Sequence, residues 1–154
     1  MRLSMTRFVT VLSFLVAITA VSAAQASAQD AGIRGGLSID PDQFYFGGHL
    51  ETSPLVNRLH FRPNVEIGIG DDLILIGANM EFLYKFPRRS GWSLYAGAGP
   101  ALNIIMPDES DESFTEGGLN ILVGAENTRG LFFEFKVGAI DSPDFKFGVG
   151  YTWR

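Results

Sequence analysis

The segment from Asp144 to Arg154 alternates strictly between apolar residues and small or polar ones. Its apolar positions are Phe145, Phe147, Val149, Tyr151 and Trp153. The residues between them are Lys146, Gly148, Gly150 and Thr152. Successive side chains of a β-strand point to opposite faces, so this period of two predicts a strand with one apolar and one polar face. A helix would need apolar residues both three and four positions apart, and no two apolar residues of this alternating set are three apart.

Seven earlier segments repeat the alternation, which makes the last segment the eighth of a set. The predicted strands are Ala31–Ile39, Gln43–Thr52, Arg58–Gly70, Leu73–Phe86, Trp92–Ile105, Phe114–Glu126, Gly130–Ile140 and Asp144–Arg154. Short turns such as Asp71-Asp72 separate most of them, and Met106–Ser113 forms the one sizeable loop. No segment after Ala28 has helical spacing, so the sequence predicts an all-β chain. The even count predicts an eight-stranded antiparallel up-and-down barrel.

The first 28 residues have the pattern of a cleavable signal peptide. Arg2 and Arg7 supply a basic start, Phe8–Val21 is an apolar run, and Ala26-Ser27-Ala28 is a small-residue cleavage site. The apolar run is shorter than the roughly 20 residues that a membrane-spanning helix needs. We therefore expect residues 1–28 to be removed on export and residues 29–154 to form the barrel domain.

Composition narrows the functions that the exported chain can have. The chain contains no cysteine, so neither a disulfide framework nor a thiolate metal site is available. Without Arg2 and Arg7, ten Lys and Arg residues stand against seventeen Asp and Glu residues, a net charge of −7. Nucleic-acid binding needs a basic face for the phosphates, so we expect no nucleic-acid partner.

Alternation alone does not say which face of the barrel is inside. A membrane barrel turns its apolar face toward lipid, whereas a soluble barrel encloses a hydrophobic ligand with it. Aromatic residues of the apolar face cluster near the segment ends, as in the interfacial girdles of membrane barrels. They are Phe61, Tyr84, Phe86, Trp92, Tyr151 and Trp153 at one rim, and Phe44, Phe46, Phe114, Phe145 and Phe147 toward the other. The glycine-rich polar face suits a crowded barrel interior, so we favour the membrane arrangement.

The last strand and the stretch from Leu94 to Pro100 resemble the small eight-stranded outer-membrane barrels. That family includes the outer-membrane protein A transmembrane domain and outer-membrane protein X. The residues that match its assembly signal are Lys146, Gly148, Tyr151 and Trp153. Arg154 departs from the pattern, in which the aromatic residue is usually the last one. The resemblance implies an outer-membrane location, both chain ends in the periplasm, contact with outer-membrane lipid, and assembly by periplasmic chaperones and the barrel-assembly machinery.

On this topology the charges of the turns separate by side of the membrane. The periplasmic side holds Arg58, Arg88, Arg89, Arg129 and Arg154. The outer turns hold Asp40, Asp42, Asp71, Asp72, Asp108, Glu109, Asp111, Glu112, Asp141 and Asp144. Of these, Asp108, Glu109, Asp111 and Glu112 form an acidic outer loop. Our hypothesis is that divalent cations bridge this rim to lipopolysaccharide phosphates, although a solvated flexible loop is the simpler interpretation.

A second set of charges falls on the polar, inward face. The members of this predicted luminal charge network are Arg62, Glu81, Glu134, Lys136 and Lys146. If Asp71-Asp72 is a two-residue turn, Arg62 stands opposite Glu81 across the ladder. Buried charges must pair, because an unpaired one is costly. The network can form a gated polar path or the packing of a plugged interior, and the narrow bore of eight strands favours the plug.

Glycines and prolines inside the predicted strands need a structural reason. The glycine pairs at 68/70, 97/99 and 148/150 match no phosphate-binding loop, and we expect them to make room for large inward side chains such as Tyr45 and Tyr95. Pro63 and Pro100 each lack a ladder donor, so each must lie at a bulge or near a rim.

The two histidines raise the question of a metal site. A turn around Pro54-Leu55 would set His49 and His60 side by side on the inner face, with Glu51 close. Two imidazoles and a carboxylate can hold a transition metal. Polar residues that face each other in a barrel lumen are ordinary, however, and no third ligand is set by the spacing. We therefore predict neither a metal site nor a cofactor.

Some barrels of this architecture modify lipids with Ser/His or His/Asp constellations at the outer rim. Ser38 and Ser142 fall near that rim, but both histidines fall at the opposite end. A nucleophile and its base must approach within about 3 Å, so we predict no enzyme. The prediction is a non-catalytic integral outer-membrane protein with a plugged polar lumen and a structural or minor surface role. The alternatives are a soluble periplasmic or secreted barrel that carries a hydrophobic ligand, and a lipid-modifying enzyme.

Overall fold

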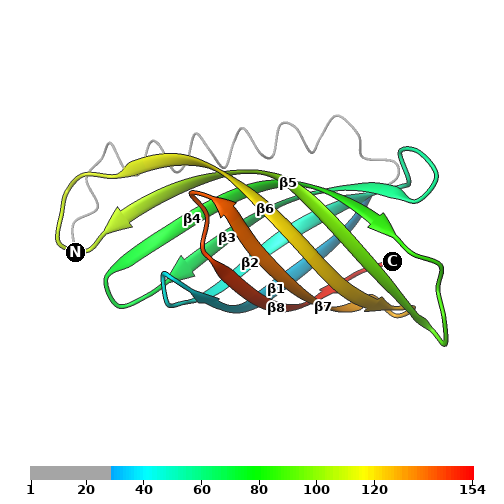
Figure 1. The fold of residues 1–154 in the computed structure, drawn as a ribbon. Helices are drawn as coiled ribbons and strands as arrows, with labels where there is room; N and C mark the ends of the chain where they lie inside the picture. Colours follow the sequence, from blue (N-terminus) through cyan, green and yellow to red (C-terminus); the bar gives the residue numbers. More distant parts are fainter. Residues whose placement is uncertain (1–28) are drawn as a thin grey trace.

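The computed structural model of the protein describes residues 29–154, so the predicted signal peptide lies outside the described residues. Eight antiparallel strands follow one another in chain order around a closed barrel (Figure 1). They are β1 (Gln29–Ile39), β2 (Gln43–Thr52), β3 (Leu59–Ile69), β4 (Leu73–Lys85), β5 (Trp92–Pro107), β6 (Phe114–Asn127), β7 (Leu131–Ile140) and β8 (Phe145–Thr152). The predicted all-β, eight-stranded barrel is confirmed. Within residues 29–154, no helix is long and apolar enough to cross a membrane.

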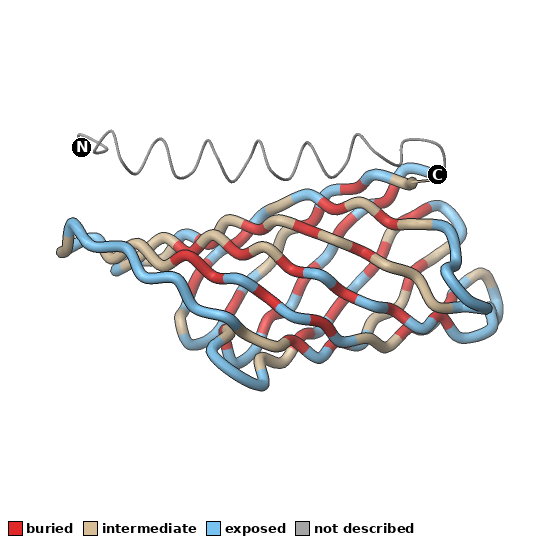
Figure 2. The backbone as a smooth tube through the Cα atoms, turned by 90° about the horizontal axis from the view of Figure 1, so that it is seen from above, coloured by how far each residue is buried: buried red, intermediate tan, exposed pale blue. Residues whose placement is uncertain are grey.

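The turns gather at two opposite ends of the barrel (Figure 1). The turns after β2, β4 and β6 share one end, which we call the arginine end. Its basic residues are Arg58, Arg88, Arg89, Arg129 and Arg154. The connections after β1, β3, β5 and β7 share the other end, which we call the acidic end because each carries exposed carboxylates. The β5–β6 hairpin projects furthest at the acidic end (Figure 2).

Tight turns set the register of neighbouring strands. Asp71-Asp72 is a two-residue turn, so Arg62 of β3 stands opposite Glu81 of β4, as the sequence predicts. Ser90 and Gly91 form a two-residue turn at the other end, and both have positive φ, 51° and 81°. Positive φ at both central residues is the requirement of a type I′ turn, whose twist matches that of the flanking strands. β1 then pairs with β8 and closes the barrel.

The apolar face of the strands points outward and the polar face points inward. Figure 2 shows buried and exposed residues alternating along the strands. Outward Leu37 is 60% exposed and outward Phe147 is 56% exposed, whereas inward Arg62 is 0% exposed. A barrel that carries a hydrophobic ligand needs the reverse arrangement, so the fold does not favour that alternative.

The two strand prolines lie where a ladder is interrupted. The β2–β3 ladder ends at Asn64, next to Pro63. The β4–β5 ladder pairs Asn79 with Ala101 and resumes beyond Pro100, which has no partner there. Proline has no backbone N–H to donate, so these gaps are the positions where it disrupts least.

Gly148 makes room for the inward Tyr45, as predicted, whereas Tyr95 is accommodated by Gly124, which is not one of the predicted glycines. A side chain at Gly148 would overlap the hydroxyl of Tyr45, and one at Gly124 would overlap the ring of Tyr95. The interior is close-packed, so the absent Cβ atoms are what allow the two tyrosines to lie inside the barrel. At Gly99, an added Cβ would meet the backbone of Met80 and not a large side chain.

The predicted meeting of His49 and His60 is wrong. The β2–β3 turn is centred near Asn57 and not at Pro54-Leu55, because Asn57 takes a positive φ of 52°. Asparagine tolerates that conformation better than most residues do. The displaced turn places His49 opposite Asn64, and His60 lies beyond the end of the ladder.

Candidate functional site

Inward charges form two groups inside the barrel. We call the first the luminal charge cluster: Arg34 on β1, Arg62 and Glu66 on β3, Glu81 on β4, Glu134 and Lys136 on β7, and Lys146 on β8. We call the second, at the arginine end, the mouth cluster: Glu51 on β2, Lys85 on β4, Glu126 on β6, and Arg154 after β8. The strand residues among them occupy inward positions of the alternation.

Glu134 contacts arginine side chains from two sides of the lumen. Its carboxylate binds the guanidinium of Arg62, and Arg34 Nη1 lies 3.2 Å from its Oε1. Arg62 Nε also lies 3.5 Å from Glu81 Oε2. These contacts join β1, β3, β4 and β7 across the bore, and they offset the cost of removing the charges from water.

The two lysines hold the remaining carboxylates. Lys136 Nζ lies 2.5 Å from Glu81 Oε1 and donates to Glu66 Oε1 at 2.9 Å. Lys146 Nζ donates to Glu66 Oε2 at 2.7 Å. Each carboxylate of the luminal charge cluster therefore has more than one cationic partner, which is the condition for a stable buried charge.

Aromatic rings pack against the luminal charge cluster. The guanidinium carbons of Arg34 and Arg62 lie 5.5 Å and 5.3 Å from the centre of the Phe132 ring. Arg62 also lies 5.0 Å from the Tyr95 ring, whose hydroxyl donates to Glu134 Oε2 at 2.8 Å. Cations over ring faces gain electrostatic stabilisation, most of all where water is excluded. Rings and ion pairs together occupy this level of the interior.

A chain of amides crosses the lumen beside these charges. Asn120 Nδ2 donates to Asn79 Oδ1 and Asn79 Nδ2 donates to Asn64 Oδ1, each at 2.8 Å. These hydrogen bonds connect β6, β4 and β3, and they satisfy side-chain amides that would otherwise be buried without partners.

The structure brings all five residues of the predicted luminal charge network into one cluster. Sequence reasoning missed Arg34 and Glu66 as members, although both fall on the inward face of their strands. Arg34 is the one inward Lys or Arg of β1. A lone inward cation must find a carboxylate in a barrel this narrow, and that signal was available in the alternation.

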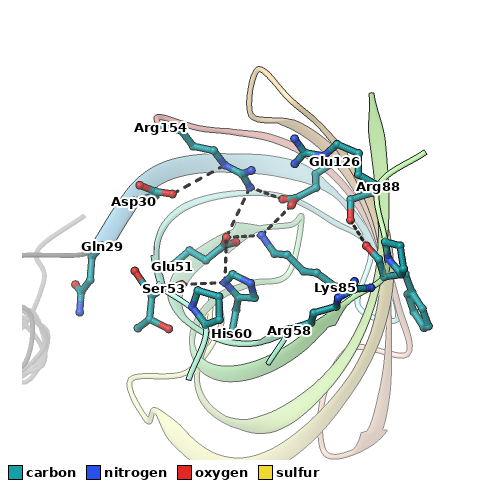
Figure 3. A pocket seen from close by; sticks show the side chains of 15 residues that line it. Gln29, Asp30, Glu51, Ser53, Arg58, His60, Lys85, Arg88, Glu126 and Arg154 are labelled. Atoms are coloured by element: carbon teal, nitrogen blue, oxygen red, sulfur yellow. Dashed lines mark hydrogen bonds and ion pairs between the residues drawn. The ribbon is translucent and has the colours of Figure 1, made fainter. Parts of the chain in front are cut away.

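The mouth cluster pairs two carboxylates with two cations (Figure 3). Lys85 Nζ binds Glu51 and lies 2.8 Å from Glu126 Oε1. Arg154 Nη2 donates to Glu126 Oε2 at 2.7 Å and lies 3.7 Å from Glu51 Oε1. Partial burial lowers the pKa of the Arg154 guanidinium, but the hydrogen bond and charge of Glu126 outweigh it and raise that pKa above its ordinary value. Arg154, the residue that departs from the assembly pattern, is thus held by Glu126.

A pocket of about 700 Å³ opens at the arginine end, with the mouth cluster in its wall (Figure 3). Arg58 and Arg88, on the turns after β2 and β4, also line it and are exposed. In the part of the chain that the structure describes, neither guanidinium has an ionic partner. Phe86 and Pro87 add apolar surface to the lining.

The remaining predicted residues are those of the assembly signal and of the acidic loop. Lys146 and Gly148 point inward, whereas Tyr151 and Trp153 point outward with ring centres 5.8 Å apart. The acidic loop residues Asp108, Glu109, Asp111 and Glu112 are exposed between β5 and β6. Within residues 29–154, no group of three or more His, Asp and Glu side chains is arranged to hold a metal ion.

The serines and histidines lie toward opposite ends of the barrel. His49 Nε2 is 2.9 Å from Thr152 Oγ1, near the arginine end. Ser38 and Ser142 lie at the acidic end. His49 stands opposite Gly32 on β1, and the six residues from there to Ser38 span about 20 Å at the rise of a strand. The pair cannot act as nucleophile and base.

Two solved structures match the barrel over most of its length. The crystal structure of the N-terminal β-barrel domain of Pseudomonas aeruginosa OprF matches with a TM-score of 0.61 and 17% identity, over 82% of this chain and 97% of that one. The crystal structure of Neisserial surface protein A (NspA) matches with a TM-score of 0.65 and 18% identity, over 81% and 94%. Both are small outer-membrane barrels of eight strands. This chain has their fold.

Comparison of the amino-acid sequence with known proteins finds no relative of this chain. No protein-family model matches the chain, and no curated protein is a match to its sequence. At the identities found, the likeness concerns the outer-membrane barrel fold and carries no assignment of function.

Proposed function

We propose that the protein is an integral outer-membrane protein that crosses the bilayer as a closed barrel. The observation that carries the proposal is that the apolar face of the barrel points outward and the polar face points inward. Large apolar side chains such as Leu37 and Phe147 are more than half exposed, whereas Arg62 is buried. A continuous apolar belt is a liability in water and the stable arrangement in lipid. Closure of β1 on β8 leaves no unpaired edge in the hydrocarbon. The likeness to OprF and NspA supports the same location.

The route to the membrane that we propose rests on two segments of the sequence. We propose export through a signal peptide at residues 1–28, then insertion by periplasmic chaperones and the barrel-assembly machinery. The strand that resembles the family's assembly signal carries Lys146, Gly148, Tyr151 and Trp153. The arginine end then faces the periplasm and the acidic end faces outward, where divalent cations at Asp108, Glu109, Asp111 and Glu112 are a proposed partner.

We propose that the inserted barrel is non-catalytic and closed, with a structural or minor surface role. Support for a closed lumen comes from the ion pairs of Arg62 and Glu134 and from the Phe132 ring, which occupy the interior at one level. Support for the absence of hydrolytic chemistry comes from the separation of Ser38 from His49 along the barrel.

Fractionation of the envelope tests the location. The full chain is expressed with residues 1–28, membranes are washed with alkali, and the outer-membrane fraction is run on gels with and without boiling. We expect the protein in the washed outer membrane, with a mobility that changes on heating because the closed ladder resists detergent until boiled. Recovery as soluble periplasmic material with no heat-dependent shift would contradict the proposal.

A further inference from the structure

Two arginines of the pocket at the arginine end carry positive charge without compensation. Arg58 and Arg88 both line the pocket, and both are exposed. Figure 3 shows Arg58 toward the lower right and Arg88 toward the upper right of the pocket, with Lys85 between them and Asp30 on the left. Within residues 29–154, neither has a hydrogen-bonding or ionic partner for its guanidinium. Two such groups beside one pocket favour an anionic ligand, and a phosphate accepts from guanidinium groups in a matched geometry.

The carboxylates of the pocket do not cancel this preference. The two in the mouth cluster are already paired with Lys85 and Arg154. Asp30 lies 3.9 Å from Arg154. Like-charge repulsion from Asp30 would direct an anion to the side of Arg58 and Arg88.

Phe86 connects the pocket with the outward apolar face. It lines the pocket, yet its side chain is 46% exposed, and its ring lies 5.2 Å from the outward Tyr84 ring in an edge-to-face contact. A ligand whose phosphate occupies the pocket can therefore lay an apolar chain along the outside of the barrel. A soluble phosphate ester has no apolar part to make that contact.

We propose that this pocket binds a glycerophospholipid, with its phosphate at Arg58 and Arg88 and its acyl chain against Phe86. The volume of about 700 Å³ is within the range of roughly 300–1,000 Å³ common for ligand sites. The inference rests on the proposed function, because a lipid source requires the arginine end to lie at a phospholipid leaflet.

The test titrates the folded barrel, purified in a maltoside detergent, and measures binding by calorimetry. One arm adds dihexanoylphosphatidylglycerol below its micelle concentration, and the other adds glycerol 3-phosphate. The pocket variant is Arg58→Gln/Arg88→Gln. Its matched control is Arg89→Gln/Arg129→Gln, which removes two exposed arginines from the same end outside the pocket lining. A heat-dependent gel shift verifies that each variant is folded.

We expect saturable binding of the lipid that is roughly tenfold weaker in the pocket variant and changes less than about twofold in the control. Equal weakening in the two variants would overturn the site in favour of diffuse attraction to the rim. Glycerol 3-phosphate binding as tightly as the lipid would overturn the lipid source. Absence of lipid binding to the wild-type barrel would overturn the whole inference, and it would leave the proposed function standing if the protein fractionates with the outer membrane.

Discussion

Arg154 Nη2 donates a hydrogen bond to Glu126 Oε2 at 2.7 Å, which joins a residue two positions beyond β8 to the inner face of β6. With Lys85 it gives the two carboxylates of the mouth cluster two cations. Without Arg154, one lysine would face both carboxylates in a largely buried setting. Arg154, which departs from the assembly pattern of the last strand, therefore supplies the second positive charge that the two carboxylates of the mouth cluster need.

The first prediction concerns this pair. Replacing Arg154 with Gln should lower the free energy of unfolding by ~1–2 kcal/mol, because a partly buried carboxylate loses a charge-assisted hydrogen bond. Urea unfolding of the barrel in lipid vesicles measures it. A double-mutant cycle with Glu126→Gln should show coupling of ~1 kcal/mol. Arg129→Gln, at an exposed turn, is the control, and strict additivity in the cycle would count against the interaction.

A larger effect is expected inside the barrel. Glu134→Gln leaves Arg34 and Arg62 short of a counter-charge in a water-poor setting and should cost ~3–5 kcal/mol of unfolding free energy. The same urea titration measures it, with Glu116→Gln as a control because Glu116 is exposed at the acidic end. Equal midpoints for the two variants would mean that the luminal charge cluster does not stabilise the barrel.

Packing around Tyr45 predicts that a destabilising substitution at Gly148 can be compensated by a second substitution at Tyr45. Gly148→Ala places a methyl group against the Tyr45 hydroxyl, whereas the next ring atom is 3.4 Å away. The substitution should therefore cost ~1–3 kcal/mol of unfolding free energy through overpacking, and adding Tyr45→Phe should restore most of that loss. Gly117→Ala, with nothing within 4 Å of its new Cβ, should change little. If the double variant is no more stable than Gly148→Ala, the predicted clash is not the cause of the loss.

The side chains in the lumen predict an electrically silent protein. An eight-stranded barrel has room for side chains and little else, and here ion pairs and the Phe132 ring occupy one level of it. Planar bilayers that contain the purified barrel should show no sustained current, beside a water-filled porin as positive control. Stable ohmic steps from the heat-shiftable protein would contradict a closed lumen and favour the gated path.

Period-two alternation was sufficient to predict the barrel, because each inward or outward position depends on the strand alone. The two-residue turn at Asp71-Asp72 likewise gave the pairing of Arg62 with Glu81. The same reasoning failed for His49 and His60, since the β2–β3 turn was assigned to the proline and lies near Asn57. The register of a hairpin is fixed by the position of its turn, so an error in the turn shifts every predicted pair of residues.

Contacts across the lumen could not be read from neighbouring strands. Arg34 reaches Glu134 from β1 to β7, strands that do not pair with each other. Such a contact depends on strand tilt and side-chain length, which no alternation pattern contains. The alternation places Phe132 on the inward face with Glu134, but its contacts with Arg34 and Arg62 could not be predicted for the same reason.

The most direct test of the central claim asks whether the outward face contacts lipid. The chain has no cysteine, so single spin labels at Phe147→Cys and Val149→Cys report outward positions of β8 without background, and Glu112→Cys reports the exposed acidic loop. In vesicles, oxygen, which concentrates in lipid, should relax the labels at 147 and 149 more than a water-soluble nickel complex does. The order should reverse at 112. Labels at 147 and 149 that respond to nickel as strongly as the one at 112 would mean that the apolar face is in water and the protein does not span a membrane.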